Sequence, residues 1–139
     1  MEIIKGINNS TIINDSYNAS YDSMKAAIEY LNELKGGKRI AVLGDILETG
    51  KFGEEIHRKV GEEVAKNKPE ILITVGELAK YIAEAANKQG MEKEKIFIYD
   101  TKEKAIGKLK GIIEPNDFVL IKASNSMKFE EIVKEIIGN

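Results

Sequence analysis

Short apolar runs alternate with helix-period stripes along most of the chain, and this alternation is the feature that most restricts its fold. The runs are rich in β-branched residues and fall at residues 11–13, 39–43, 71–75, 96–99 and 118–121. Nearly continuous apolar runs are typical of strands covered on both faces, as in a parallel sheet. The stripes between them recur at helical spacing over residues 24–34, 56–64, 78–86, 105–113 and 129–137. The sequence therefore predicts an α/β fold: a three-layer, open, mostly parallel sheet with right-handed crossovers.

The first 14 residues break this rhythm. Residues 2–5 and 10–14 flank a short segment containing Gly6, which predicts an N-terminal β-hairpin or antiparallel edge strand. Helix caps are expected at Ser20 or Asp22 for the first helix, at Thr101 for the fourth, and at Ser124 or Ser126 for the last. No repeat or linker divides the chain, so we expect a single domain over residues 1–139.

Composition excludes several classes of function. The 139 residues carry 21 basic and 23 acidic side chains, a net charge of −2, which argues against a nucleic-acid-binding domain. No apolar run reaches the roughly 20 residues of a membrane span, and no signal peptide is visible, so we expect a cytoplasmic domain. The absence of cysteine excludes thiolate metal sites and cysteine nucleophiles, and the single histidine, His57, excludes a multi-histidine metal site.

Polar residues just after each strand are the candidate ligand contacts, because ligands of open α/β sheets collect at the carboxyl ends of the strands. Residues 44–52 place a glycine-containing loop between a strand and a helix, but five residues separate its glycines and Phe52 replaces the P-loop hydroxyl. Asp45 and Glu48 in this loop can bind a cation or an ammonium group. The alternative is ordinary turn polarity.

Two other strand ends offer chemistry. In residues 15–23, Asp15 can accept hydrogen bonds from a ribose, Asn18 can pair with a base edge, and a tyrosine can stack, although local turns would explain the same composition. Lys122 precedes a predicted helix start and can bind a carboxylate or phosphate, unless it is simply solvated. His57 has no identifiable partner, which favours a hydrogen-bonded histidine over a general base.

Three segments in order resemble one family. DSYNA at residues 15–19 resembles its D-[SA]-Y-N-A-N-P segment, and IAVLGDILETG at 40–50 resembles A-V-L-G-D-M-x-E-L-G, followed by HRKVG at 57–61. VLIKASNSM at 119–127 resembles V-L-V-K-G-S-R-x-M. Together they are similar to the C-terminal domain of the Mur ligases, in the branch that adds D-alanyl-D-alanine to UDP-N-acetylmuramoyl-tripeptide.

This resemblance implies one domain of a three-domain, ATP-dependent ligase of cytoplasmic peptidoglycan synthesis. ATP and Mg²⁺ would be bound mainly by a central domain outside this chain, which would therefore be inactive by itself. By resemblance, Asp15, Tyr17 and Asn18 would face the nucleotide, and no metal ligand would lie in this domain. The substrate-binding residues would be Asp45, Glu48, Lys122, Ser124 and Asn125, of which the last three would lie near the D-alanyl-D-alanine carboxylate. His57 matches a family position without an implied role.

The sequence also departs from the family pattern. Ser20 and Tyr21 replace Asn-Pro, and Ala123 and Asn125 replace Gly and Arg, which removes a guanidinium suited to a carboxylate. Two alternatives therefore stay open: another Mur-type amide ligase with a different nucleophile, and a free-standing flavodoxin- or receiver-like binding module.

Overall fold

The computed structural model describes residues 1–138 and shows strands and helices where the sequence predicts them. The strands are β1 (Glu2–Lys5), β2 (Thr11–Asn14), β3 (Arg39–Gly44), β4 (Ile71–Val75), β5 (Ile96–Tyr99) and β6 (Phe118–Lys122). The helices are α1 (Tyr21–Glu33), α2 (Gly53–Asn67), α3 (Ala79–Lys88), α4 (Lys102–Ile112) and α5 (Glu130–Ile136). Short 3₁₀ turns connect several of them.

All six strands form one sheet in the order β1-β2-β6-β3-β4-β5. The pairs from β2 to β5 are parallel, and β1 pairs antiparallel with β2, with Ile3 opposite Ile13. The mostly parallel sheet and its antiparallel N-terminal hairpin are therefore confirmed.

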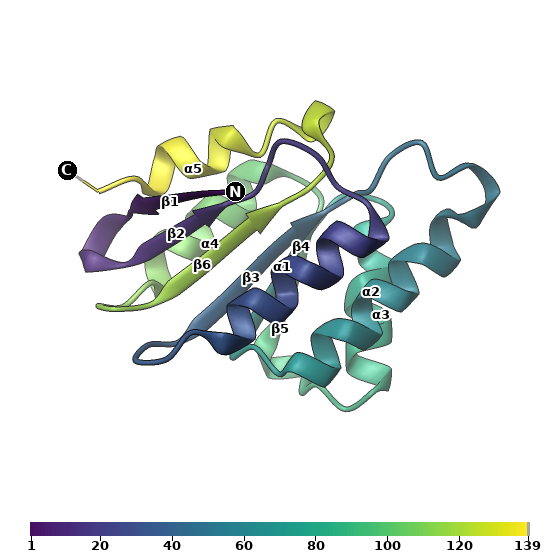
Figure 1. Cartoon of the computed structure of the whole chain (residues 1–139), viewed down its shortest axis with the longest axis horizontal. Coiled ribbons are helices and arrows are strands. Elements are labelled where there is room, and N and C mark those ends of the chain that lie inside the picture. The colour runs from purple at the N-terminus through teal and green to yellow at the C-terminus, as the bar shows by residue number, and fades with distance from the viewer. Residues whose placement is uncertain (139) are drawn as a thin grey trace.

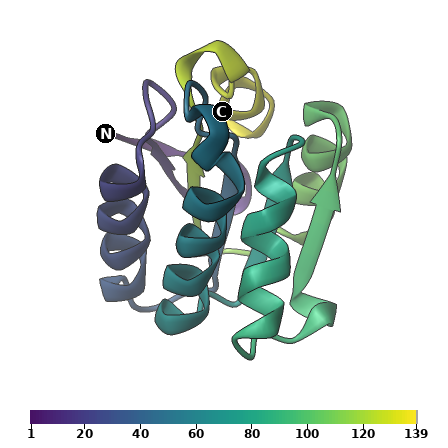
Figure 2. The same ribbon diagram turned by 90° about the vertical axis from the view of Figure 1, so that its right-hand side faces the viewer.

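Helices cover both faces of the sheet, giving three layers (Figure 1). Apolar residues of α1, α2 and α3 form one core with alternate residues of the strands, such as Ile13, Leu43 and Leu120. Those of α4 and α5 form a second core with the opposite set, including Val42 and Ile121. Figure 2 shows α1, α2 and α3 side by side along the first face. The connection from β5 to β6 runs back across the sheet, and its helix α4 covers the face opposite α1, α2 and α3, as a right-handed crossover requires.

The predicted helix caps are confirmed for two helices and wrong for the last. Ser20 caps α1 by accepting from the Ser23 amide, and Thr101 caps α4 by accepting from the Lys104 amide. Neither Ser124 nor Ser126 caps α5, because Ser124 precedes and Ser126 lies within a 3₁₀ turn at Asn125–Met127, which ends before this helix begins. Phe129 occupies the N-cap position of α5 without a side-chain bond.

The order of the strands reverses between β6 and β3. The chain leaves β3 toward α2 on one face and leaves β6 toward α5 on the other, so the two loops diverge at this point. Such a switch point leaves a crevice at the carboxyl ends of the strands, where ligands of doubly wound sheets bind. The candidate site lies there.

Candidate functional site

The three loops singled out in the sequence meet around one cleft of about 610 Å³. The loop after β2 contributes residues 18–21, the loop after β3 contributes residues 46–49, and the loop after β6 contributes residues 124–126; Ile56 of α2 completes the lining. These segments are far apart in the sequence and are brought together by parallel strands ending at one edge. The cleft is therefore the candidate binding site.

Asp45 lies below the cleft surface and holds the start of α3. It follows Gly44, the last residue of β3, and is 7% exposed. Its Oδ1 accepts hydrogen bonds from the backbone amides of Leu78 at 3.0 Å and Ala79 at 2.8 Å. Burial raises the pKa of Asp45, and the two amide donors oppose that rise. The carboxylate thus ties the loop after β3 to the N-terminus of a helix, where a negative charge is favourable.

His57 joins the same loop to α2. The fully buried ring contacts the Gly53 carbonyl oxygen through Nδ1 at 2.6 Å and the Ile46 amide through Nε2 at 2.9 Å. Burial lowers the pKa of His57, although the Gly53 carbonyl and the nearby Asp45 carboxylate oppose this effect. The sequence favoured a hydrogen-bonding histidine at the surface or only partly buried; the hydrogen bonding is confirmed, but the position is wrong because the ring is fully buried.

Ser124 joins the loop after β3 to the loop after β6. Its Oγ accepts from the Leu47 amide at 2.8 Å, and its own amide donates to the Asp45 carbonyl oxygen at 3.0 Å. Between these fixed points the chain turns through Glu48, which has a left-handed φ of 61° and an exposed side chain. Glu48 is therefore displayed at the rim of the cleft by a loop that is held from below.

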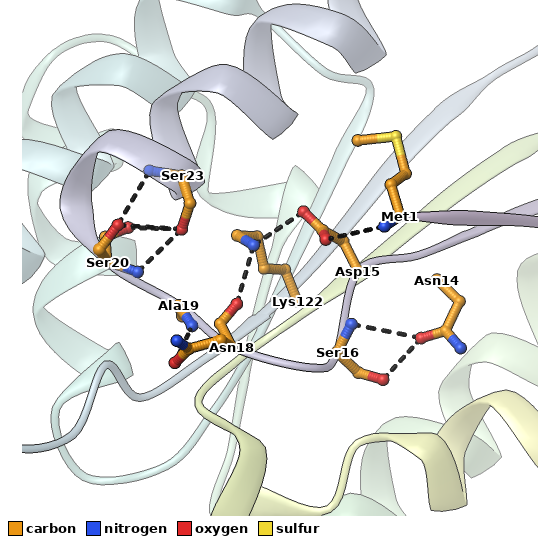
Figure 3. A network of polar contacts seen from close by, with 9 residues as sticks. All are labelled: Met1, Asn14, Asp15, Ser16, Asn18, Ala19, Ser20, Ser23 and Lys122. Atoms are coloured by element: carbon orange, nitrogen blue, oxygen red, sulfur yellow. Dashed lines mark hydrogen bonds and ion pairs between the residues drawn. The ribbon is translucent and has the colours of Figure 1, made fainter.

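Lys122 ends β6 and is the most deeply buried charged side chain of the site (Figure 3). Its Nζ donates to Asp15 Oδ2 at 2.7 Å and to the Asn18 carbonyl oxygen at 2.9 Å. Lys122 is 2% exposed, whereas the Asp15 side chain is 19% exposed. The ammonium group thus holds the loop after β2 at its first residue and at its middle, and both of its hydrogen bonds are made to this loop.

The loop held by Lys122 exposes two side chains with different surroundings. Tyr17 is 82% exposed and lies beside a second depression of about 380 Å³, which Asp15 and Asn125 also line. Asn18 lies at the cleft, and its Oδ1 accepts from the Ala19 amide at 2.8 Å (Figure 3). Asn125 lines both depressions, so they adjoin each other at the loop after β6.

The residues selected from the sequence therefore divide into two groups. Asn18, Glu48, Ser124 and Asn125 line the cleft, and Asp15 and Tyr17 line the adjoining depression. Asp45, His57 and Lys122 line neither depression but hold the loops from beneath.

Sequence reasoning missed several lining residues, among them Leu47, Thr49 and Tyr21. Tyr21 begins α1, and its hydroxyl lies 3.5 Å from a carboxylate oxygen of Glu63 on α2; burial, followed by the Glu63 charge, raises the pKa of Tyr21. Leu47 and Thr49 flank Glu48, and their position in a strand-end loop was the available signal. An apolar side chain such as Leu47 in such a loop resembles a core residue when only the sequence is read.

Residues 1–138, which the structure describes, contain no group of three or more histidine, cysteine, aspartate or glutamate side chains placed to hold a metal ion. No helix within these residues combines the length and apolar character needed to cross a bilayer.

The chain is a doubly wound α/β domain, the class of fold in which ligands commonly bind at the switch point of the sheet. Residues 1–125 match the family model described as "Mur ligase, glutamate ligase domain", and the chain belongs to this family.

Relatives of known name agree with this assignment. The chain is 42% identical over 138 residues to the UDP-N-acetylmuramoyl-tripeptide–D-alanyl-D-alanine ligase of Bacillus subtilis, covering 99% of this chain and 30% of that protein. The corresponding ligase of Escherichia coli is 32% identical over 133 residues, covering 94% of this chain and 28% of that protein. Among solved structures, the MurF ligase of Thermotoga maritima in complex with ADP superposes with a TM-score of 0.79 at 25% identity, covering 96% of this chain and 29% of that chain. The chain thus spans about 30% of the length of the relatives it matches.

Proposed function

We propose that this chain is the C-terminal domain of an ATP-dependent ligase that joins D-alanyl-D-alanine to UDP-N-acetylmuramoyl-tripeptide in the cytoplasm. The observation that carries this proposal is the convergence of all three motif loops on one cleft at the switch point. The names of the relatives, which match over nearly the whole chain, support the choice of substrates.

The domain would supply binding walls and not the phosphate chemistry. Its sequence lacks a P-loop, so ATP phosphates and Mg²⁺ would be held mainly by a companion domain. In such a ligase the tripeptide carboxylate is activated as an acyl phosphate, which the amine of the dipeptide attacks. Closing this cleft over that intermediate would exclude water from a group that hydrolyses readily.

The structure suggests different roles for the exposed and the buried members of the site. Tyr17 presents a ring on which an adenine can stack, and Asn18 presents an amide at the adjoining cleft, so these two would contact the nucleotide. Glu48 and Asn125 would face the dipeptide, because both line the cleft with exposed side chains. Asp15 would meet the nucleotide only through its exposed fraction, because Lys122 binds one of its oxygens.

The buried side chains would position the loops. Asp45 and Lys122 are enclosed and engaged with neighbouring residues, and Ser124 is bound to the Leu47 amide. We therefore assign Asp45 and Lys122 to shaping the cleft, and Ser124 to holding its two walls together.

A domain exchange tests the proposal directly. This chain would replace the corresponding 30% of the Bacillus subtilis ligase, to which it is 42% identical. The chimera is expected to release phosphate from ATP only when UDP-N-acetylmuramoyl-tripeptide and D-alanyl-D-alanine are both present. The truncated ligase without this domain, and this chain alone, are the controls and are expected to be inactive.

A panel of amine nucleophiles separates the proposal from its alternatives. Preference for a single amino acid over D-alanyl-D-alanine would favour another Mur-type amide ligase, to which the replacement of an arginine by Asn125 gives some weight. Ligation by the isolated chain would contradict the assignment of the chemistry to other domains. Tight binding of flavin by this chain would favour the flavodoxin-like alternative.

A further inference from the structure

His57 is the single histidine of the chain, and its two ring nitrogens bond to two different elements. One partner is the Gly53 carbonyl oxygen, one turn earlier in α2, and the other is the Ile46 amide, in the loop that forms the β3 side of the cleft. The ring therefore lies between a rigid helix and a wall of the binding site.

These two partners leave the ring only one protonation state. A carbonyl oxygen can only accept a hydrogen bond, so Nδ1 carries the proton that bonds to Gly53. A backbone amide can only donate, so Nε2 is unprotonated and accepts from Ile46. Hence His57 is the neutral Nδ1–H tautomer. A second proton, at Nε2, would make this nitrogen a donor that faces the N–H of Ile46, and the hydrogen bond between them would be lost.

The loop that His57 holds needs such an anchor. Glu48 adopts a left-handed backbone conformation, which is unfavourable for a residue with a β-carbon. The amides on its N-terminal side are fixed by side chains from two other elements: Ile46 by His57 of α2, and Leu47 by Ser124 of the loop after β6. Without the first of these bonds, the Ile46 amide would be buried without an acceptor.

The charged surroundings of the ring are simple. Asp45, on the loop after β3, is the charged side chain that acts on His57. The N-terminus of α3 presents backbone amides that Asp45 already occupies, and Glu77 beside them acts on Asp45. Burial outweighs the attraction of Asp45 and lowers the pKa of His57, so the ring stays neutral at neutral pH.

We propose that His57 is a positioning residue whose Nδ1–H tautomer holds residues 46–49 in place as the wall of the cleft, and that protonation of the ring releases this wall. The inference goes beyond the proposed function, because it does not depend on which ligand enters the cleft. It assigns His57 no contact with substrate.

A matched pair of substitutions separates the anchor from the rest of the ring. His57→Gln places a carbonyl oxygen near the position of Nε2, so it keeps an acceptor for Ile46. His57→Asn places an amide N–H near the position of Nδ1, so it keeps the bond to Gly53 and loses the anchor. Both variants remove the aromatic ring, and they therefore share the loss of its packing.

Nuclear magnetic resonance on this chain provides the test, because one histidine gives one unambiguous pair of ring ¹⁵N signals. The wild-type ring is expected to show a protonated Nδ1 and an unprotonated Nε2, the less common tautomer of a free histidine side chain. The Ile46 amide is expected to exchange about tenfold faster with solvent in His57→Asn than in His57→Gln, the ratio expected from one lost hydrogen bond. As the pH is lowered, the Ile46 and Leu47 amide signals are expected to shift with the same midpoint as the ring.

Three results would overturn the proposal. They are a wild-type ring protonated at Nε2 at neutral pH, equal exchange of the Ile46 amide in the two variants, and titration of the ring without any change at Ile46. The first and third need only the wild-type chain, so they decide the matter even if His57→Asn does not fold. None involves ligation, so failure of the chimera experiment is a separate result.

Discussion

Removing Asp15 is expected to destabilise the fold more than removing Lys122, although both changes break the same ion pair. The asymmetry follows from exposure: the Lys122 side chain is 2% exposed and that of Asp15 is 19% exposed. After Asp15→Ala, the ammonium group stays enclosed with the Asn18 carbonyl oxygen as its remaining acceptor in the structure. After Lys122→Met, an apolar side chain of similar length fills the space, and the Asp15 carboxylate still reaches water.

The magnitudes follow from the cost of an uncompensated charge. Leaving a buried ion without its partner costs about 3–5 kcal/mol, which is the estimate for Asp15→Ala. Lys122→Met loses two hydrogen bonds without burying a new charge. The bond to the Asp15 carboxylate is worth about 1.5–3 kcal/mol, and the Asn18 carbonyl belongs to an exposed residue that water can reach, so we place Lys122→Met near 2 kcal/mol. For 139 residues, 1 kcal/mol corresponds to roughly 3–4 °C in Tm. The losses of the two variants differ by about 1–3 kcal/mol, so their Tm values are expected to differ by roughly 3–12 °C.

The double variant makes the test decisive. Adding Lys122→Met to Asp15→Ala removes the stranded ammonium group, so the double variant is expected to be more stable than Asp15→Ala alone. Urea unfolding followed by circular dichroism gives the free energy of unfolding for each of the four chains. Additive losses in the double variant, or a larger loss from Lys122→Met than from Asp15→Ala, would refute the reasoning from burial and indicate that the lysine stem contributes chiefly by packing.

Three further predictions concern the loops around the cleft. The free energy of unfolding is expected to fall as pH drops below 6.5, the ordinary pKa of histidine, because burial lowers the pKa of His57 and the unfolded chain therefore binds the proton first. Urea midpoints from about pH 7.5 to about pH 5 measure this fall, and His57→Gln is expected to make the dependence on pH less steep. Gly76→Ala is expected to cost about 2 kcal/mol more than Gly90→Ala, because both positions have a positive φ but a β-carbon at Gly76 alone would meet the carboxylate that caps α3; equal losses in Tm would contradict this. Ser124→Ala is expected to lower the free energy of unfolding by about 1–2 kcal/mol, because it leaves the Leu47 amide without its acceptor. Ser126→Ala, at an exposed position, should change it by less than about 0.5 kcal/mol, and thermal unfolding distinguishes the two variants.

The fold was predictable because its signals are periodic and local. Each apolar run became a strand with ends within one residue of those expected, and each stripe became the buried face of a helix. The start of α5 was mispredicted for a tertiary reason. Ser124 has the residue type of a cap, but its hydroxyl bonds to the amide of Leu47, 77 positions earlier in the sequence, and no local pattern signals that partner.

The convergence of the three motif loops was predictable, but the orientation of their side chains was not. The strand-end rule selected five segments, and the three that carry the motifs line one cleft because parallel strands end at one edge. Whether a polar residue in such a loop faces the cleft or the interior depends on distant partners. Asp45 is enclosed because the amide of Ala79, 34 positions away, begins a helix beside it. Lys122 is enclosed because Asp15, 107 positions away, directly follows the neighbouring strand β2.

The same distinction gives the departures from the family pattern different meanings. Ala123 replaces a glycine at a fully buried position, where its β-carbon fills space beside Gly44, so this change concerns packing. Ser20 replaces an asparagine and forms the capping box of α1 with Ser23, so the helix start is secured by another means. Asn125 is exposed and lines both depressions, so an uncharged amide stands there where the family has the positive charge of an arginine. Ser20, Tyr21 and Asn125 all line the cleft, but of these changes only the one at Asn125 removes a charged group that a ligand would meet. The nucleophile panel therefore bears on Asn125 before any other residue.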